Sequence, residues 1–160
     1  MKRLWAPWRK VYIRPRGPKK SGCVFCSLLK KNRDTRHYIL KRSRYSFSVL
    51  NLYPYNNGHV LILPKRHIKY IAQMTDPEKL DWLDMCQRVQ SALEKSMRPQ
   101  GFNWGMNFGR TSGAGVPGHL HMHVVPRWNG DTNFMQVLGE TKVISESLAS
   151  VYRELKAKLP

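Results

Sequence analysis

The 160-residue chain lacks three features, and each absence excludes a class of protein. It has only three cysteines, and this odd, small number does not make the disulfide framework of a small secreted domain. No stretch approaches the roughly 18 consecutive apolar residues of a membrane span. The charged N-terminus has no apolar segment behind it, which argues against a secretory signal. We therefore expect a cytoplasmic protein without a membrane anchor.

Acidic residues are also scarce. Ten Asp and Glu stand against 28 Lys and Arg, which gives a net charge of +18. The excess is concentrated in residues 1–20, which contain no acid, and in residues 30–44, where Asp34 is the one acidic residue. Such a field attracts polyanions. The partner could be a nucleotide with several phosphates or a nucleic acid, and the charge alone is equally compatible with a solvated surface.

Length and the apolar pattern predict one α+β domain with an antiparallel sheet. The proline-rich, charged residues 1–20 are expected to form a basic N-terminal arm, and residues 21–160 a single domain. A helical turn is expected at 23–31. Strand-like alternation occurs at residues 37–41, 45–53, 58–63, 102–108 and 119–126.

A long amphipathic helix is predicted over 76–97, with Asp76 as N-cap and Pro77 in the first turn. A second helix is predicted at 144–159. The apolar stripe of the long helix consists of Leu80, Leu83, Cys86, Val89, Leu93 and Met97.

Three of the six histidines, His119, His121 and His123, alternate within five residues. On a strand, this period of two puts three imidazoles on one face, where they would pack poorly as a core. A three-histidine metal site and a phosphate-handling site both remain open on spacing alone. The preceding segment 107–118 is rich in glycine, whose backbone N–H groups can approach a phosphate closely, and it contains Arg110. The composition of this loop therefore favours the phosphate-handling site over the three-histidine metal site.

The pair Cys23 and Cys26, spaced as Cys-x-x-Cys, supplies half of a tetrahedral zinc site. A metal-free buried pair is the alternative. A redox role is disfavoured because no βαβ pattern surrounds the pair.

Two motifs resemble the histidine triad (HIT) family. Residues 118–128, Gly-His-Leu-His-Met-His-Val-Val-Pro-Arg-Trp, match its His-x-His-x-His signature, and residues 57–65 match its second signature, Gly-His-x-Leu-x-x-Pro. Cys23-x-x-Cys26 and Asn51 also fit, so the resemblance covers roughly residues 21 to 138. Residues 50–56 and 124–134 look most like the bacterial branch related to diadenosine tetraphosphate hydrolases and phosphorylases.

The resemblance implies a HIT-like antiparallel sheet with one long central helix and a C-terminal helix. It implies that His121 attacks the α-phosphorus to form a nucleotidyl-histidine intermediate, while His123 holds phosphate oxygens and His59 supports both. The nucleotide-binding residues implied are Asn51, Asn107, Arg110, Thr111, Ser112, Gly115, Val116 and His123.

The chain departs from the better-known branches just before the triad. Those branches have Gln or Ser there, whereas this chain has Gly115, Val116, Pro117 and Gly118. The backbone amides of Gly115 and Val116 are then expected to contact the leaving group, and the leaving-group preference is left open.

Relatives with the Cys pair commonly complete a structural zinc site with two histidines, which here are His67 and His119. The family also generally forms homodimers through the long helix and the sheet edge. The expected function is a nucleotide hydrolase or transferase that cleaves dinucleoside polyphosphates. The alternatives are an adenosine phosphoramidase, and a basic nucleotide-binding protein that associates with nucleic acid through its arm.

Overall fold

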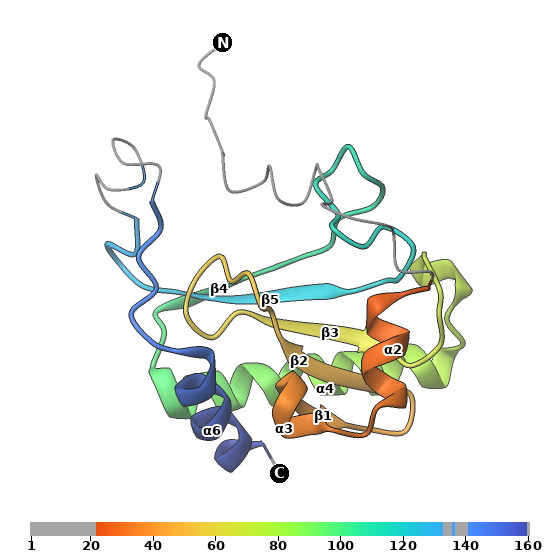
Figure 1. The fold of residues 1–160 in the computed structure, drawn as a ribbon, viewed down its shortest axis with the longest axis horizontal. Helices are drawn as coiled ribbons and strands as arrows, with labels where there is room; N and C mark the ends of the chain where they lie inside the picture. Colours follow the sequence, from red (N-terminus) through yellow and green to blue (C-terminus); the bar gives the residue numbers. More distant parts are fainter. Residues whose placement is uncertain (1–21, 133–135, 137–140, 160) are drawn as a thin grey trace.

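The computed structural model describes residues 22–132, 136 and 141–159 (Figure 1). The predicted basic arm, residues 1–20, therefore lies outside the described residues. Within the described part of the chain, no helix is long and apolar enough to cross a membrane.

Five strands form one sheet in the order β1-β2-β3-β5-β4, and all neighbouring pairs are antiparallel. The strands are β1 Ile39–Arg42, β2 Ser46–Leu50, β3 Val60–Pro64, β4 Gly101–Gly105 and β5 Met122–Arg127. The helical elements are α2 Val24–Lys30, α3 Asp34–His37, η2 Ile71–Gln73, α4 Asp76–Met97 and α6 Leu148–Lys158. The predicted α+β fold, with its long helix and C-terminal helix, is confirmed.

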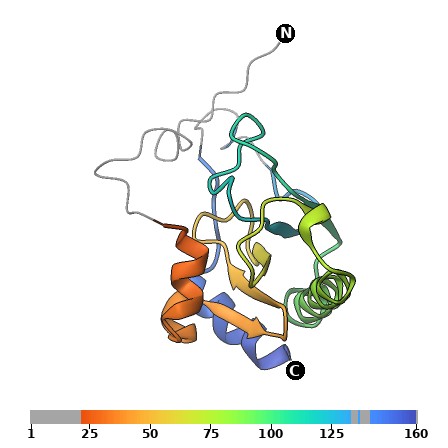
Figure 2. The same ribbon diagram turned by 90° about the vertical axis from the view of Figure 1, so that its right-hand side faces the viewer.

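The helices cover the two faces of the sheet unequally. Figure 2 shows α2 on one side of the sheet and the long α4 on the other. The α4 side holds the larger core, in which Ile62 and Val124 pack with Trp82 and other apolar residues of α4 and α6. On the α2 side, Phe25 packs against a smaller cluster on β2 and β3.

The register of β3 against β5 decides which face the histidines occupy. Val60 pairs with Val124, and both point into the core beside α4. Leu61 pairs with His123, so these two side chains share the opposite face. His59 and His121, two residues away along the chain from Leu61 and His123, fall on that same face.

The prediction of a strand over 119–126 is wrong at its start, because β5 begins at Met122. The ladder with β3 runs from Val60 to Ile62 and stops near Pro64, which has no N–H to donate. The Pro64 carbonyl instead accepts from His119 Nε2 at 2.9 Å. His119 and His121 therefore lie in extended chain just ahead of the strand.

Two predicted element starts are also corrected. The expected strand at 37–41 begins only at Ile39, because Asp34–His37 forms the short helix α3 and Tyr38 leaves it with φ 55°. The expected helix at 144–159 begins at Leu148, where the Ser147 hydroxyl accepts from the Ser150 N–H and caps it.

The long helix has the predicted extent but a different cap and a different buried face. Its N-cap is Thr75, which forms a reciprocal capping box with Glu78, rather than Asp76. Leu80 and Leu83 are 70% and 49% exposed, contrary to the predicted stripe. The buried face begins instead at Trp82 and includes Met85, Cys86, Val89, Ala92 and Leu93.

The turn before β3 is held in place by α4 and by the end of β5. Gly58 has φ +70°, and a Cβ there would lie 2.8 Å from Leu93 Cδ2 and Met97 Sδ on α4. The Asn56 side chain donates to the Pro126 carbonyl at 3.1 Å and to Asp131 at 2.8 Å. Because His59 follows this turn directly, its place is set by α4 and by the end of β5.

Candidate functional site

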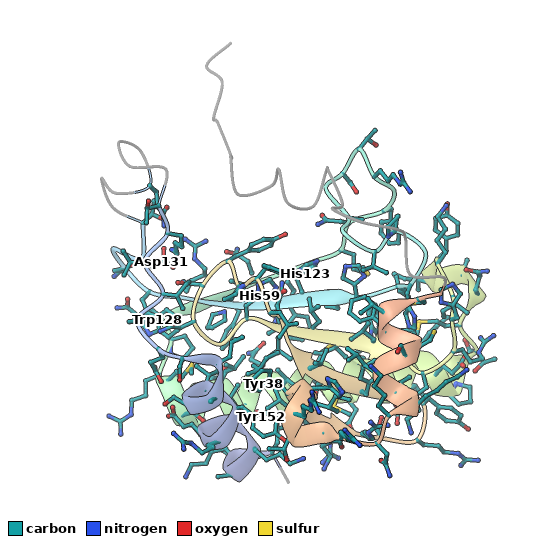
Figure 3. All side chains as sticks on the ribbon, viewed as in Figure 1. Tyr38, His59, His123, Trp128, Asp131 and Tyr152 are labelled. Carbon is teal, nitrogen blue, oxygen red and sulfur yellow. The ribbon has the colours of Figure 1, made fainter. Side chains whose placement is uncertain are left out.

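Five of the six histidines form a continuous row on the α2 face of the sheet. In order along the row they are His59, His123, His121, His119 and His67. The ring centroids of His59 and His123 are 5.1 Å apart, as are those of His123 and His121. Figure 3 shows His59 and His123 side by side over the centre of the sheet. The Phe25 ring of α2 packs against both His121 and His119, with its centroid 5.5 and 5.6 Å from theirs.

His121 is held in one tautomer by the backbone just before it. Its Nδ1 donates to the His119 carbonyl at 2.7 Å, which leaves the lone pair on Nε2. The ring is 7% exposed, and burial lowers its pKa below the usual 6.5. A neutral imidazole with a fixed, free Nε2 lone pair is a competent nucleophile at neutral pH.

The neighbouring pair, His59 and His123, has its protons fixed by a chain of hydrogen bonds. The backbone N–H of Tyr55 donates to His59 Nδ1 at 3.0 Å, so the His59 proton lies on Nε2. That Nε2–H donates to His123 Nδ1 at 2.9 Å. His123 must then carry its proton on Nε2.

The Nε2–H of His123 is a buried donor with no partner among the described residues. Buried donors are normally satisfied, so an unpaired one marks a place where a ligand atom belongs. It sits beside the His121 ring, where a phosphate oxygen would receive it.

Burial keeps these rings neutral. Burial, with a smaller contribution from the neighbouring imidazoles, lowers the pKa of His59 to about 3 and of His123 to about 4. Three adjacent imidazoles can share one face without repulsion only while they remain uncharged.

The lowered pKa values predict a pH-dependent stability. The unfolded chain, with histidine pKa values near 6.5, binds more protons than the folded chain between about pH 4 and 6.5. The free energy of unfolding should therefore fall between pH 7 and pH 5, by up to about 2 kcal/mol for each of His59 and His123. Urea unfolding at both pH values measures this. A His59→Asn variant should lose less stability over the same range, and an equal loss would contradict the prediction.

Asn51 lies at the His59 end of the row. Its Nδ2 is 3.3 Å from His59 Nδ1, and its Oδ1 accepts from the Tyr53 N–H at 3.0 Å. The amide predicted to bind ribose is thus next to the histidine pair rather than out on the surface.

The glycine-rich loop leaves the sheet beside the triad. Gly105, the last residue of β4, pairs with His123, so the loop starts next to the row. Arg110, Thr111, Ser112 and Gly115 are exposed, while Asn107 and Val116 are half-buried. The Ser112 hydroxyl donates to the carbonyls of Phe108 and Gly109, at 2.8 and 2.9 Å, and so closes the loop on itself.

The four predicted metal ligands come together at the other end of the row. One ligand atom each from Cys23, Cys26, His67 and His119 lies within 4.8 Å of the other three. His119 Nδ1 is 3.4 and 3.6 Å from the two sulfurs, and His67 Nδ1 is 3.4 Å from Cys26 Sγ. Ligands about 2.1–2.3 Å from one tetrahedral zinc ion would be separated by about this much.

The second nitrogen of His119 supports the metal assignment. Its Nε2 donates to the Pro64 carbonyl, which leaves the Nδ1 lone pair directed at the cysteines. Such an outer hydrogen bond is usual for a metal-ligating histidine. Two thiols and two histidines with free lone pairs fit zinc.

Sequence reasoning missed two aromatic residues of the site. Tyr55 stacks on His123 with centroids 5.6 Å apart and planes 10° apart, and its amide sets the tautomer of His59. Phe25 contacts both His121 and the predicted metal ligand His119. Phe25 is an unspecified position of the Cys23-x-x-Cys26 motif and Tyr55 lies within residues 50–56, but neither motif specifies these side chains, so no role was predicted for them.

A hollow of about 590 Å³ lies elsewhere, between the end of β5, α4 and α6. Trp128 and Asp131, labelled in Figure 3, line it. None of the row histidines lines it.

Known proteins share both the sequence pattern and the fold. The profile of the HIT domain matches residues 32–130. The AP-4-A phosphorylase of Mycobacterium tuberculosis is 35% identical over 162 residues, covering 97% of this chain and 83% of the relative. The asymmetrical bis(5′-nucleosyl)-tetraphosphatase of Schizosaccharomyces pombe is 31% identical over 71% of this chain and 63% of its own length.

A solved structure agrees with these matches. The Zn-bound histidine triad family protein from Mycobacterium smegmatis superposes with a TM-score of 0.69 at 25% identity, over 86% of this chain and 93% of that one. With the sequence profile, the relatives and the fold in agreement, the chain belongs to the histidine triad (HIT) family.

Proposed function

We propose that this protein cleaves dinucleoside polyphosphates of the diadenosine tetraphosphate type by transferring a nucleotidyl group through His121. The observation that carries the proposal is the presence of two neighbouring nitrogens with fixed roles: the Nε2 lone pair of His121, and the Nε2–H of His123, which has no partner among the described residues. The first is a nucleophile and the second a donor for the phosphate under attack. The phosphorylase and tetraphosphatase relatives support this substrate class.

In the first step, His121 Nε2 attacks the α-phosphorus. A P–N bond forms, the P–O bond to the bridging oxygen breaks, and the leaving nucleoside polyphosphate takes the electron pair. The His119 carbonyl, which accepts from His121 Nδ1, stabilises the positive charge that develops on the ring. In the second step, water or phosphate attacks the phosphorus, the P–N bond breaks, and the proton of the acceptor is released.

The remaining predicted residues would bind the substrate around this centre. Asn51, beside His59, would bind ribose hydroxyls, and Asn107 the phosphates. The exposed Arg110 and Thr111, with the amides of Gly115 and Val116, would contact the leaving group. Ser112 would have to give up its bonds within the loop to do the same.

Cys23, Cys26, His67 and His119 would hold a structural zinc ion. A zinc ion bound there would contribute rigidity rather than a chemical step, because it would tie the start of α2 to the residues that lead into the triad.

We also propose a cytoplasmic homodimer. Reduced cysteines, which a zinc site needs, suit a reducing compartment. β4 is an edge strand with Trp104 37% exposed, and it offers a surface on which a second copy can pair. Sedimentation velocity tests the dimer.

Product identification tests the function. Incubation with diadenosine tetraphosphate should give AMP and ATP if water is the acceptor, or ADP and ATP if phosphate is. Turnover of adenosine phosphoramidate without turnover of the dinucleotide would favour the phosphoramidase alternative. If no adenylyl substrate is cleaved, the enzymatic proposal is wrong.

The donor role of His123 gives a further prediction. His123→Ala removes one charge-stabilising donor, so kcat should fall about 10²–10³-fold while nucleotide affinity changes little. Steady-state kinetics and equilibrium binding measure the two quantities. A loss confined to affinity would show that His123 only binds substrate.

A further inference from the structure

Two exposed aromatic side chains that have no role in the proposed function stack on each other between segments that flank the histidine row. The ring centroids of Tyr70 and Phe108 are 6.1 Å apart, and their planes are 22° apart. The two residues are 45% and 43% exposed. Large aromatic side chains left this open commonly mark a binding surface.

The pair bridges two segments that flank the triad. Phe108 directly follows Asn107 at the start of the glycine-rich loop. Tyr70 follows Ile68, whose carbonyl accepts from the Leu120 N–H at 2.7 Å. The stack therefore lies beside the chain that leads into His121, at the His67 end of the row.

This end is opposite the one where Asn51 contacts His59. If one nucleoside of a dinucleotide binds near Asn51, its phosphates run along the histidines and the second nucleoside arrives near Tyr70 and Phe108. A substrate with two nucleosides needs a second base site of this kind, whereas a mononucleotide does not.

The charges around the stack match such a ligand. Lys69 Nζ lies 4.8 Å from the centroid of the Tyr70 ring, and the exposed Arg110 is two residues beyond Phe108. Aromatic faces stack on nucleobases, and neighbouring cations attract the phosphates that connect the base to the reaction centre. An apolar peptide would gain nothing from these cations.

We propose that Tyr70 and Phe108 form a stacking platform for the distal base of a dinucleoside polyphosphate, the base that departs with the leaving group. The proposal deepens the proposed function and rests on it. It also gives a side-chain basis for leaving-group selection in a chain that has no polar side chain at residues 115–118.

A comparison of two ligands tests the platform. Dissociation constants are measured for diadenosine tetraphosphate and for adenosine 5′-tetraphosphate, which has the same phosphates but no distal nucleoside. The His121→Asn background keeps both ligands intact. Tyr70→Leu with Phe108→Leu retains apolar bulk but removes both stacking faces. Tyr45→Leu is the matched control, because Arg44 lies over the Tyr45 ring at 5.1 Å in a turn between β1 and β2.

The double variant should bind the dinucleotide about tenfold more weakly and the mononucleotide as before. The Tyr45 control should change neither constant. Equal weakening for both ligands, or no weakening for either, would overturn the platform. Weakened binding of single-stranded RNA with unchanged dinucleotide binding would also overturn it, by assigning the stack to nucleic acid. Turnover by the unaltered protein decides the proposed function separately, because this binding measurement needs no cleavage.

Discussion

Replacing His121 with alanine is expected to lower kcat/KM for a dinucleoside polyphosphate by about 10⁴-fold while leaving nucleotide affinity nearly unchanged. The reason is geometric. Of the ring nitrogens of His121 and His123, the Nε2 of His121 is the one whose lone pair can attack phosphorus. His123 Nδ1 accepts from His59, and His123 Nε2 carries a proton. No neighbouring group can replace a nucleophile fixed in this way, whereas the phosphate-binding donors remain in place.

The measurement combines steady-state kinetics with a search for the covalent intermediate. Rapid quenching at high pH, where a P–N bond to histidine survives, should reveal one nucleotidyl group on the peptide containing His121. His37→Ala is the matched control, because His37 lies at the end of α3 outside the row, and full activity is expected. An active His121→Ala variant would disprove covalent catalysis by this residue.

The chemistry of the site was easier to predict than its protonation. The sequence shows that His59 and His123 belong to two signatures, but it does not show that their nitrogens meet at 2.9 Å across 64 residues. The tautomers depend on a backbone amide, that of Tyr55, and every residue has one. Residue type alone therefore predicts which side chains act, and hydrogen-bond geometry decides which atom does so.

Element ends were mispredicted where two local preferences compete. Asp76 and Thr75 are both good N-caps, and Thr75 prevails because Glu78 completes its capping box. Leucines at 80 and 83 continue a helical period, yet Trp82 and Met85 set the buried face, with the Trp82 indole donating to the Ile62 carbonyl at 3.1 Å. The sheet core and the common face of the triad histidines were predictable because both follow from the two-residue period of extended chain.

Chelating a bound zinc ion is expected to lower the melting temperature of this protein by about 10 °C. Zinc present at about a thousand times its dissociation constant stabilises the folded state by about 4 kcal/mol, and a domain of this size melts about 2–4 °C lower for each kcal/mol lost. Removal of the ion should loosen the residues around the triad as well as α2. His119 would be both a ligand and, through its carbonyl, the residue that orients His121.

Calorimetry with and without EDTA, together with metal analysis of the purified protein, measures this effect. Cys23→Ser should melt lower than the unaltered protein and should no longer respond to EDTA. Cys86→Ala is the matched control, because Cys86 lies on the buried face of α4, in the core. Its replacement creates a cavity there and keeps all four predicted zinc ligands. The control should melt lower yet keep its response to EDTA. If the unaltered protein contains no zinc and EDTA leaves its melting temperature unchanged, the cysteine–histidine cluster has no metal-dependent role in stability.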